Sequence, residues 1–385
     1  MPRPLVLLML CNLVIGTSAF VVAGILGPIA TDLGVSLAAA GQTMTAYALA
    51  TALLAPLALM ASGRWPRKRV LVAAMALFTL GNATCALAQQ LGTLLAGRVL
   101  MGAGAVFTPV AASLAISLVE PARRGQALAF VFLGASLSYV IGVPLGSWLG
   151  LRYGWATAVA VATVASALAT VALAWRVPAH VQAPGASFAG LGGVLARRDV
   201  VAVLALTVLY FTAIFAVFSY IGPVLQALVP MSGEMQALTL TLFGLAGVAG
   251  SLAGGAASDR FGAERCLRVQ LVVLGATMAL LPLTAGHWAT MMAALVVWGT
   301  AGFGMMPPQQ SRLAHLAPAQ APLLLSLNNS MLYGGTALGA AIGGLAMQPL
   351  GLARLSWVGV PLTAAAMGLL WLGARRTRGA ASANG

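Results

Sequence analysis

Twelve long apolar runs, separated by short polar gaps, constrain this chain more than any other feature. A helix needs about 20 residues to cross a bilayer, and each run reaches or approaches that length. With 61% hydrophobic and 7% charged residues among 385, the composition excludes a soluble globular protein. We therefore predict an all-α membrane protein with twelve transmembrane helices. The expected spans are Leu5–Ala30, Ala38–Met60, Arg69–Ala88, Thr93–Leu118, Gly125–Gly150, Trp155–Trp175, Val200–Gln226, Gln236–Ala257, Leu267–Ala285, Trp288–Pro308, Pro322–Gln348 and Leu355–Gly373.

The basic residues are distributed unevenly between alternate gaps. One set of gaps holds only Arg152 and Arg354, whereas the other set holds most of the remaining arginines and the lysine. Because loops rich in Lys and Arg stay in the cytoplasm, we expect both termini and the central stretch Arg176–Asp199 to be cytoplasmic. The net charge of +14 thus reflects topology. It does not indicate nucleic-acid binding, since no basic patch is interleaved with aromatic residues.

The chain reads as two similar halves. We expect an N-terminal six-helix bundle at 1–175, a cytoplasmic linker at 176–199, a C-terminal bundle at 200–375 and a cytoplasmic tail at 376–385. Gly102-Ala103-Gly104 in the fourth span has a counterpart in Gly302-Phe303-Gly304 of the tenth. Paired halves of this kind predict two pseudo-symmetric bundles with a substrate cavity near the midplane of the membrane.

Arg98 is the only formal charge that lies away from the ends of an expected span. A guanidinium there costs at least about 2.5 kcal/mol on insertion scales, so it should face a polar interior. It can contribute to a substrate or coupling site, or it can lock helices together by donating to carbonyl groups of a neighbour. We favour the functional role and keep the lock as the alternative.

The fifth expected span carries small residues four apart, interrupted by Pro144. This spacing places them near one helix face, where another backbone can approach closely. The stripe can simply pack helices, or it can also form an interface along which bundles rock, and the sequence leaves both roles open. Its members are Gly134, Ser138, Gly142, Gly146 and Gly150.

Several polar or aromatic residues also lie inside expected spans. Some should line a substrate or coupling cavity, and others should bond neighbouring helices. Asn328 and Asn329 point about 100° apart on a helix, so we expect only one to face the interior. The candidates, with Asp32 at the outer end of the first span, are Asn12, Tyr47, Ser138, Tyr139, Tyr210, Trp298, Asn328, Asn329 and Tyr333.

No residue pattern supports catalysis. There is no zinc-protease helix motif, no pair of carboxylates within a span and no nucleophile elbow. Cys11, Cys85 and Cys266 lack metal-ligand spacing. We therefore expect no enzyme activity, no cofactor and no metal site.

An ordered set of short motifs resembles the major facilitator superfamily, and within it the drug:proton antiporter branch that includes arabinose-efflux-like and chloramphenicol-resistance permeases. The motifs run through the fourth, fifth, seventh, tenth and eleventh spans and the loop after the eighth. They are Asp259-Arg260-Phe261-Gly262, Arg98 to Gly104, Gly142-Val143-Pro144-Leu145-Gly146, Phe215 to Pro223, Pro308 to Leu313 and Ser326 to Asn329.

The resemblance implies two six-helix bundles that alternate access to a central cavity. It also implies cytoplasmic gating loops at Arg64, Arg67 and Lys68, and at Asp259 with Arg260. The chain departs from the branch in two places. Gly63 replaces the aspartate of the first loop, and the first span, at Thr17 to Val21, lacks the usual acid.

We expect a monomeric transporter of the bacterial inner membrane that exports a small organic molecule such as a drug, sugar or metabolite. Coupling to proton entry follows from the resemblance alone. An uncoupled facilitator or an exchanger of anionic metabolites is the alternative within transport, and a non-transporting receptor or scaffold is the alternative from another class. Cationic substrates are disfavoured, because all six acids lie in gaps or at span ends: Asp32, Glu120, Asp199, Glu234, Asp259 and Glu264.

Overall fold

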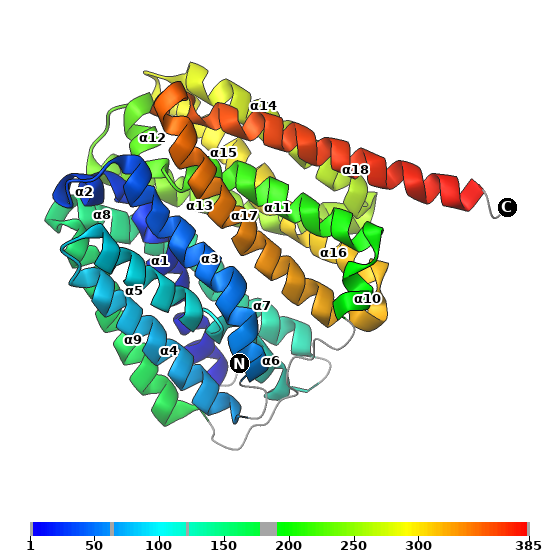
Figure 1. The fold of residues 1–385 in the computed structure, drawn as a ribbon, viewed down its shortest axis with the longest axis horizontal. Coiled ribbons are helices and arrows are strands. Elements are labelled where there is room, and N and C mark those ends of the chain that lie inside the picture. The colour runs from blue at the N-terminus through cyan, green and yellow to red at the C-terminus, as the bar shows by residue number, and fades with distance from the viewer. Residues whose placement is uncertain (1–2, 62–64, 121–122, 178–190, 383–385) are drawn as a thin grey trace. The chain divides into compact units, whose positions relative to one another are not determined.

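The computed structural model describes residues 3–61, 65–120, 123–177 and 191–382. Within these ranges the regular secondary structure is helical throughout (Figure 1). Twelve helical segments of the described chain are long and apolar enough to cross a membrane, which confirms the predicted number and order. They are Arg3–Gly24, Leu37–Ala61, Arg67–Ala86, Leu91–Ser117, Arg124–Tyr153, Trp155–Arg176, Arg198–Phe218, Gly233–Phe261, Ala263–Thr284, Trp288–Leu316, Leu323–Leu350 and Leu352–Leu372.

The described helices pack into two compact units. The first unit comprises the described residues of Met1–Ser187 with Ser219–Gln226 and Met231–Gly244, and the second comprises the remainder. Parts of the seventh and eighth spans therefore pack with the first six. This division groups residues by their contacts and does not test the boundaries predicted from the sequence. Those boundaries stay predictions: the halves 1–175 and 200–375, the linker 176–199 and the tail 376–385. The last helix, α18 (Gly359–Ser382), runs past the predicted end of the twelfth span.

Most of the first unit is built from the helices of the first six spans. α4 packs on both α5 and α9, and α3 packs on α5, so these helices run side by side in Figure 1. The helices are α1 (Arg3–Gly24), α2 (Leu26–Asp32), α3 (Leu37–Ala61), α4 (Arg67–Ala86), α5 (Leu91–Gly104), α6 (Phe107–Ser117), α7 (Arg124–Leu137), the π-helical turn η2 (Ser138–Gly142), α8 (Val143–Tyr153) and α9 (Trp155–Arg176).

Prolines explain two interruptions in these helices. α1 ends at Gly24, four residues before Pro28, whose ring clashes with that carbonyl and which has no N–H to donate to it. The chain turns at Ile25, with φ −116° and ψ 18°, before α2. In the fifth span Pro144 likewise cannot donate to the carbonyl four residues earlier. A π-helical turn takes up the change there, and the N–H of Val143 donates to the carbonyl of Ser138.

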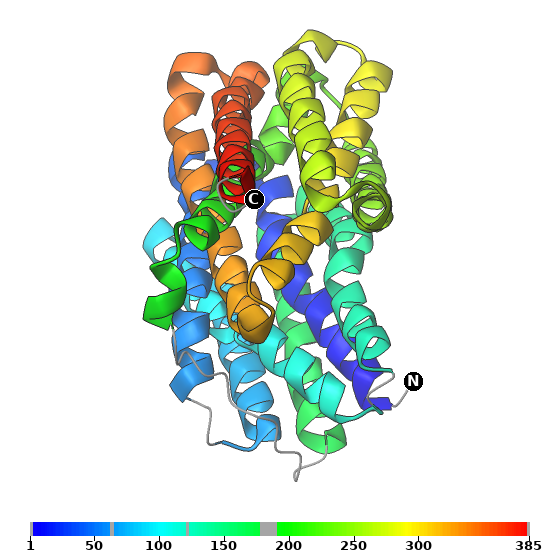
Figure 2. The same cartoon turned by 90° about the vertical axis from the view of Figure 1, so that its right-hand side faces the viewer.

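The predicted stripe of small residues packs against α1, which lies beside α7 in Figure 2. A Cβ atom on Gly134 would lie 1.9 Å from the carbonyl oxygen of Met9, and one on Gly142 would lie 1.8 Å from the hydroxyl of Thr17. Gly146 and Gly150 meet α1 and Ile25 just after it in the same way, and Pro144 is buried beside them. At Gly134 a larger side chain would meet the backbone of α1, whereas at the other three glycines it would meet side chains. A role for the stripe in rocking stays a prediction.

The second unit repeats this seam around α11 (Arg198–Phe218), which packs on α17 (Ala321–Leu350) and α18. A Cβ on Gly335 would lie 2.6 Å from the carbonyl oxygen of Val208, and one on Gly339 would lie 2.7 Å from that of Thr212. The other helices of the second half of the chain are α10 (Leu191–Leu195), α12 (Ile221–Leu228), α13 (Gly233–Phe261), α14 (Ala263–Leu280), α15 (Trp288–Gly304) and α16 (Met306–Leu316).

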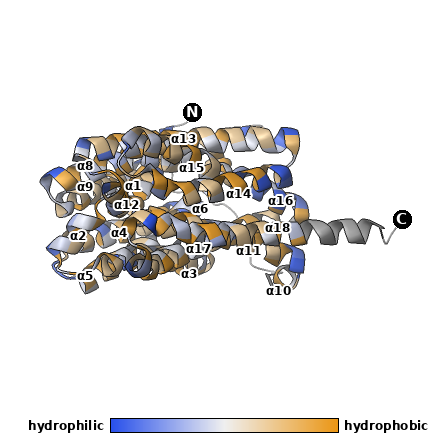
Figure 3. Cartoon of the chain, turned by 90° about the horizontal axis from the view of Figure 1, so that it is seen from above, coloured by the Kyte–Doolittle hydropathy of each residue, from blue (hydrophilic) through white to orange (hydrophobic). Residues whose placement is uncertain are grey.

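Large apolar side chains are exposed on the helices or just after their ends. Trp175 is 82% exposed, Leu345 80% and Leu87 79%. Figure 3 shows hydrophobic residues along the helices and hydrophilic ones mostly near helix ends. Such exposure is unfavourable in water and natural in lipid, so the surface agrees with a membrane-embedded chain.

Candidate functional site

Arg98 lies in the interior of the first unit, on α5, and is 1% exposed. Its Nε donates to the carbonyl oxygen of Thr43 at 3.1 Å, and its Nη1 to that of Ser18 at 2.9 Å. Its Nη2 donates to the carbonyl oxygen of Ala19 at 2.6 Å. All three nitrogens of the planar guanidinium therefore bond α5 to the backbones of α1 and α3, which are the contacts expected of a lock. Participation in transport stays a prediction.

The charge of Arg98 is offset by an aromatic ring as well as by these carbonyl groups. Its Cζ lies 5.0 Å from the centroid of the buried Tyr47 ring, within the range of a cation–π interaction. The two ion pairs in the described part of the chain are Arg197–Asp199, at 2.7 Å, and Arg268–Glu264, at 2.5 Å. Arg98 takes part in neither, so dipoles and a ring surround it.

A small pocket inside the first unit is lined by Arg98, Asn82, Cys85 and Trp155, which come from α5, α4 and α9. The Asn82 amide nitrogen is buried and has no acceptor within the described residues. Trp155 donates from its indole Nε1 to Asp32 Oδ2 at 2.8 Å. Asp32 is itself exposed, so it lies at a solvated surface and not beside the arginine.

Tyr139 and Tyr47 belong to one aromatic stack. Phe20 stacks on Tyr139, with ring centroids 5.1 Å apart, and meets the ring of Tyr47 edge-on at 6.5 Å. Tyr139 lies in the π-helical turn and is half-buried. The stack thus leads from the fifth span through the first span to the ring beneath Arg98.

Asn12 and Ser138 make bonds that hold helices together. Asn12 donates from Nδ2 to the carbonyl oxygen of Val131 at 3.2 Å and accepts from the Thr108 hydroxyl at 2.8 Å, so it joins α1 to α7 and α6. The Ser138 hydroxyl donates to the carbonyl of Ala135 within its own span, at 2.7 Å. Both side chains are occupied by structural bonds.

A neutral polar cluster ties α11 to α16 and α17 in the second unit. Gln309 Nε2 donates to the carbonyl oxygen of Val203 at 2.5 Å and to the Thr207 hydroxyl at 2.9 Å. Thr207 then donates to Asn328 Oδ1 at 2.6 Å. Gln309, Thr207 and Asn328 are each 1% exposed or less. Asn329 is exposed, as the 100° between adjacent helical residues allows.

The other predicted second-half residues lie near this cluster along the chain. Tyr210, one turn after Thr207, is buried and donates from its hydroxyl to the carbonyl oxygen of Gly302 on α15. Trp298 is 1% exposed, and Tyr333 is half-buried. The position that matches Arg98 in the repeat, Trp298, therefore also lies in an interior, but without a charge.

The predicted gating residues that the structure describes lie at or near helix ends. Arg64 lies outside the described residues. Arg67 begins α4 and is buried, and Lys68 is half-buried. At the end of α13, Asp259 and Arg260 are exposed, and the Arg260 guanidinium lies 5.2 Å from the Phe261 ring centroid. Their role as gates stays a prediction.

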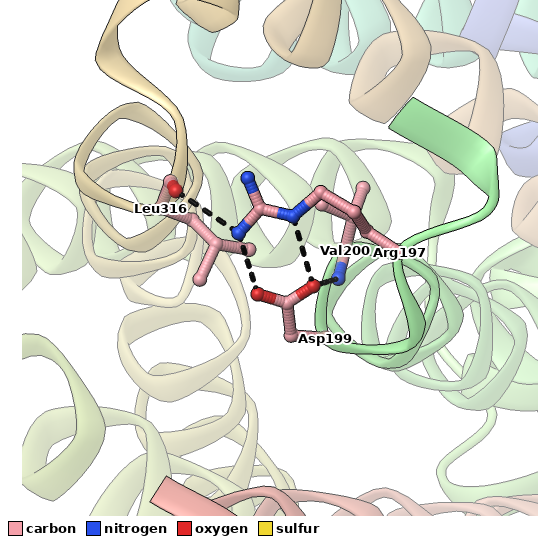
Figure 4. Close-up of polar contacts among 4 residues, drawn as sticks. All are labelled: Arg197, Asp199, Val200 and Leu316. Atoms are coloured by element: carbon pink, nitrogen blue, oxygen red, sulfur yellow. Dashed lines mark hydrogen bonds and ion pairs between the residues drawn. The ribbon is translucent and has the colours of Figure 1, made fainter. Parts of the chain in front are cut away.

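Arg197 makes a different contact at the start of α11 (Figure 4). Its Nη2 donates to Asp199 Oδ2 at 2.7 Å and to the carbonyl oxygen of Leu316 at 3.3 Å, at the C-terminus of α16. Asp199 also accepts from the backbone N–H of Val200. A cation at the end of α16 complements the helix dipole there, so this exposed pair joins two helix ends of the second unit.

Four glutamine and threonine residues that bond helices were not among the predicted site residues, although one of them lies in a quoted motif: Gln226, Gln236, Thr207 and Gln309. A local signal existed for one acceptor only. Because Pro28 has no N–H, the sequence indicates that the carbonyl of Gly24 lacks its donor within the helix. Gln236 Nε2 supplies that donor at 2.8 Å. No spacing in the sequence indicates that residue 236 would reach residue 24.

Twelve apolar helical segments in the described part of the chain, with large apolar side chains exposed on them, together define a polytopic integral membrane protein. The sequence pattern described as Major Facilitator Superfamily matches residues 8–231 and again 203–384. The chain belongs to this superfamily and is a membrane transporter.

Relatives align over nearly the whole chain. The "Inner membrane transport protein YdhP" of Escherichia coli (strain K12) is 31% identical over 97% of this chain and 96% of its own. A "Probable sugar efflux transporter" of Pasteurella multocida (strain Pm70) is 26% identical over 91% of this chain and 87% of its own.

Solved structures show the same fold at low identity. A D-xylose-proton symporter superposes with a TM-score of 0.80 at 15% identity, covering 95% of this chain and 96% of the other. A bacterial homologue of the lysosomal transporter Spinster, in an inward-facing and occupied conformation, superposes with a TM-score of 0.78 at 17% identity, covering 97% and 98%. At this level of identity, the two structures show that the fold is shared and nothing about the substrate.

Proposed function

We propose that this transporter exports a small organic molecule from the cytoplasm by alternating access, in exchange for protons. The efflux relative that aligns over 91% of the chain is the observation that carries the direction of transport. The interrupted fifth span, seated on α1 through its glycine seam, resembles the antiporter motif of the drug:proton branch and supports the same direction.

In this proposal both termini face the cytoplasm, because the arginine-rich gaps alternate with gaps that hold only Arg152 and Arg354. The Gly24 end of α1 then faces the periplasm. The gating loops after the second and eighth spans lie on the cytoplasmic side. A monomer with six spans in each half is sufficient for this mechanism.

The proposed substrates are neutral or anionic. Arg98 is a buried cation bonded to carbonyl groups, whereas Asp32 and Asp259 are exposed. A permanently cationic molecule that leaves water needs a nearby carboxylate to offset its lost hydration. A drug, sugar or metabolite without positive charge fits this charge distribution.

The test is transport by the purified protein in sealed vesicles, using a panel that contains a neutral phenicol, a sugar, a carboxylate and a quaternary ammonium dye. The proposal expects movement of a neutral or anionic compound that speeds up when a pH gradient is imposed. Transport of the quaternary dye alone would contradict the substrate class, and transport of no compound would contradict export.

A second candidate is an uncoupled facilitator or an exchanger. It is favoured by the first span, where the branch usually has an acid. Here Thr17 packs on Gly142, the Ser18 and Ala19 carbonyls bind Arg98, and Phe20 stacks on Tyr139. In the same vesicles, transport at a rate independent of the pH gradient would establish this candidate in place of antiport.

A further inference from the structure

The carbonyl of Gly24 is where several segments of the first unit meet. The break before Pro28 frees this oxygen from the helix of the first span. Gln236, which is 1% exposed, donates to it from Nε2 at 2.8 Å. Gly222 approaches the same oxygen so closely that a Cβ there would lie 2.4 Å from it. The ends of the seventh and eighth spans thus converge on one acceptor of the first span.

A second glutamine holds the first in place. Gln226 Nε2 donates to Gln236 Oε1 at 3.1 Å and to the carbonyl oxygen of Met231 at 2.9 Å. Gln226 Oε1 accepts from the Met231 N–H at 3.2 Å. Because both ends of the Gln226 amide are bonded to the turn between the spans, Gln236 is oriented with its N–H₂ toward Gly24.

The geometry points to a latch, defined as Gln236, Gln226 and the Gly24 carbonyl, that holds the periplasmic ends of the seventh and eighth spans on the first span. Gln236 and Gln226 are positioning residues that set how often this end opens. The latch rests on the proposed function only for its place in the transport cycle. Its neutral amides fit a contact that must break and reform, since a buried charge would be costly to separate.

Release can be measured without substrate by the reaction of a thiol with a maleimide. Ser219 is 1% exposed and belongs to the same segment of the first unit as Gly222, so Ser219→Cys serves as a reporter of opening. The native Cys11, Cys85 and Cys266 are all buried. Alkylation at each cysteine is followed separately by mass spectrometry, and Cys85 reports general unfolding.

Gln236→Leu removes the donor and leaves the Gly24 carbonyl unpaired, which should raise the alkylation rate of the reporter about tenfold. Gln348→Leu is the matched control, because Gln348 is exposed near the end of α17, and it should leave the rate unchanged. An unchanged rate in Gln236→Leu would overturn the latch. So would an equal rise at Cys85, because the loosening would then be global.

Gln236→Glu distinguishes a hydrogen-bond latch from simple packing. A protonated carboxyl can donate to Gly24 and accept from Gln226, whereas a carboxylate cannot donate. The alkylation rate of Ser219→Cys is measured with Gln236→Glu and with the native Gln236 at each pH. The ratio of the two rates should be low in acid and high in alkali. A ratio that does not change with pH would contradict the latch. Failure of vesicle transport would instead contradict the export proposal and leave these rates unaffected.

Discussion

The two units bond their helices with different chemistry at corresponding places. In the first unit, the fourth span donates a charged fork from Arg98 to carbonyls of the first and second spans. In the second unit, the tenth and seventh spans are joined by the neutral Gln309 and Tyr210. A stripe of glycines seats the fifth or eleventh span on the first or seventh in both. The glycine seam is therefore repeated in the second unit, whereas the buried charge is not.

This difference determines how much free energy is lost when a bond between helices is broken. A buried guanidinium that loses its acceptors retains its charge, whereas an amide that loses one bond remains neutral. The largest loss from a single substitution in the first unit should therefore follow the removal of Arg98. In the second unit the bonds between helices are distributed over Gln309, Thr207 and Asn328. A single substitution there should therefore destabilise the protein less.

The largest expected effect follows Arg98→Ala. The change leaves three carbonyl groups of α1 and α3 without their donors and removes the charge beside Tyr47. Export should fall to about a hundredth of the parent rate, as about 2.7 kcal/mol of lost stabilisation would produce. Initial rates in vesicles, normalised to the amount of inserted protein, measure it. A normal export rate would show that Arg98 is not needed for transport. Loss of inserted protein would show that its role is to hold the helices together.

Gly134→Ala tests the glycine seam of the first unit, which the second unit repeats at Gly335 and Gly339. The new Cβ would meet the Met9 carbonyl at 1.9 Å, so α7 must move from α1, at a cost of about 2–3 kcal/mol. Gly125→Ala is the control on the same helix, where nothing lies within 4 Å, and should stabilise by about 0.5–1 kcal/mol. Thermal unfolding of the purified variants gives both values. Equal behaviour of the two glycines would mean that the seam is loose.

Gln309→Leu should have a smaller effect, about 1–2 kcal/mol, because it removes two donated bonds from a neutral cluster. Gln310 is the neighbouring residue and is exposed, so Gln310→Leu should change stability by less than about 0.5 kcal/mol. The same unfolding assay compares them. If Gln309→Leu proved as damaging as Arg98→Ala, the contrast between charged and neutral ties would disappear.

The sequence predicted the features that depend on local pattern. Run length gave the twelve spans, four-residue spacing gave the seam from Gly134 to Gly150, and helical geometry gave the contrast between Asn328 and Asn329. It did not predict partners. The acceptors of Arg98 are carbonyls, which every residue carries, and Gln236 is 212 residues from Gly24. Such bonds follow from packing, and no spacing in the chain indicates them.

The central claim is that the shape of the Arg98 fork matters, and not its charge alone. Arg98→Lys tests this most directly, because an ammonium keeps the charge but cannot donate in three planar directions to the carbonyls of Thr43, Ser18 and Ala19. Initial export rates should be measured for the parent, Arg98→Lys and Arg98→Ala in the same vesicle preparation. The account predicts that the lysine variant inserts normally and transports little faster than the alanine variant. A lysine variant that exports at half the parent rate or more would contradict it.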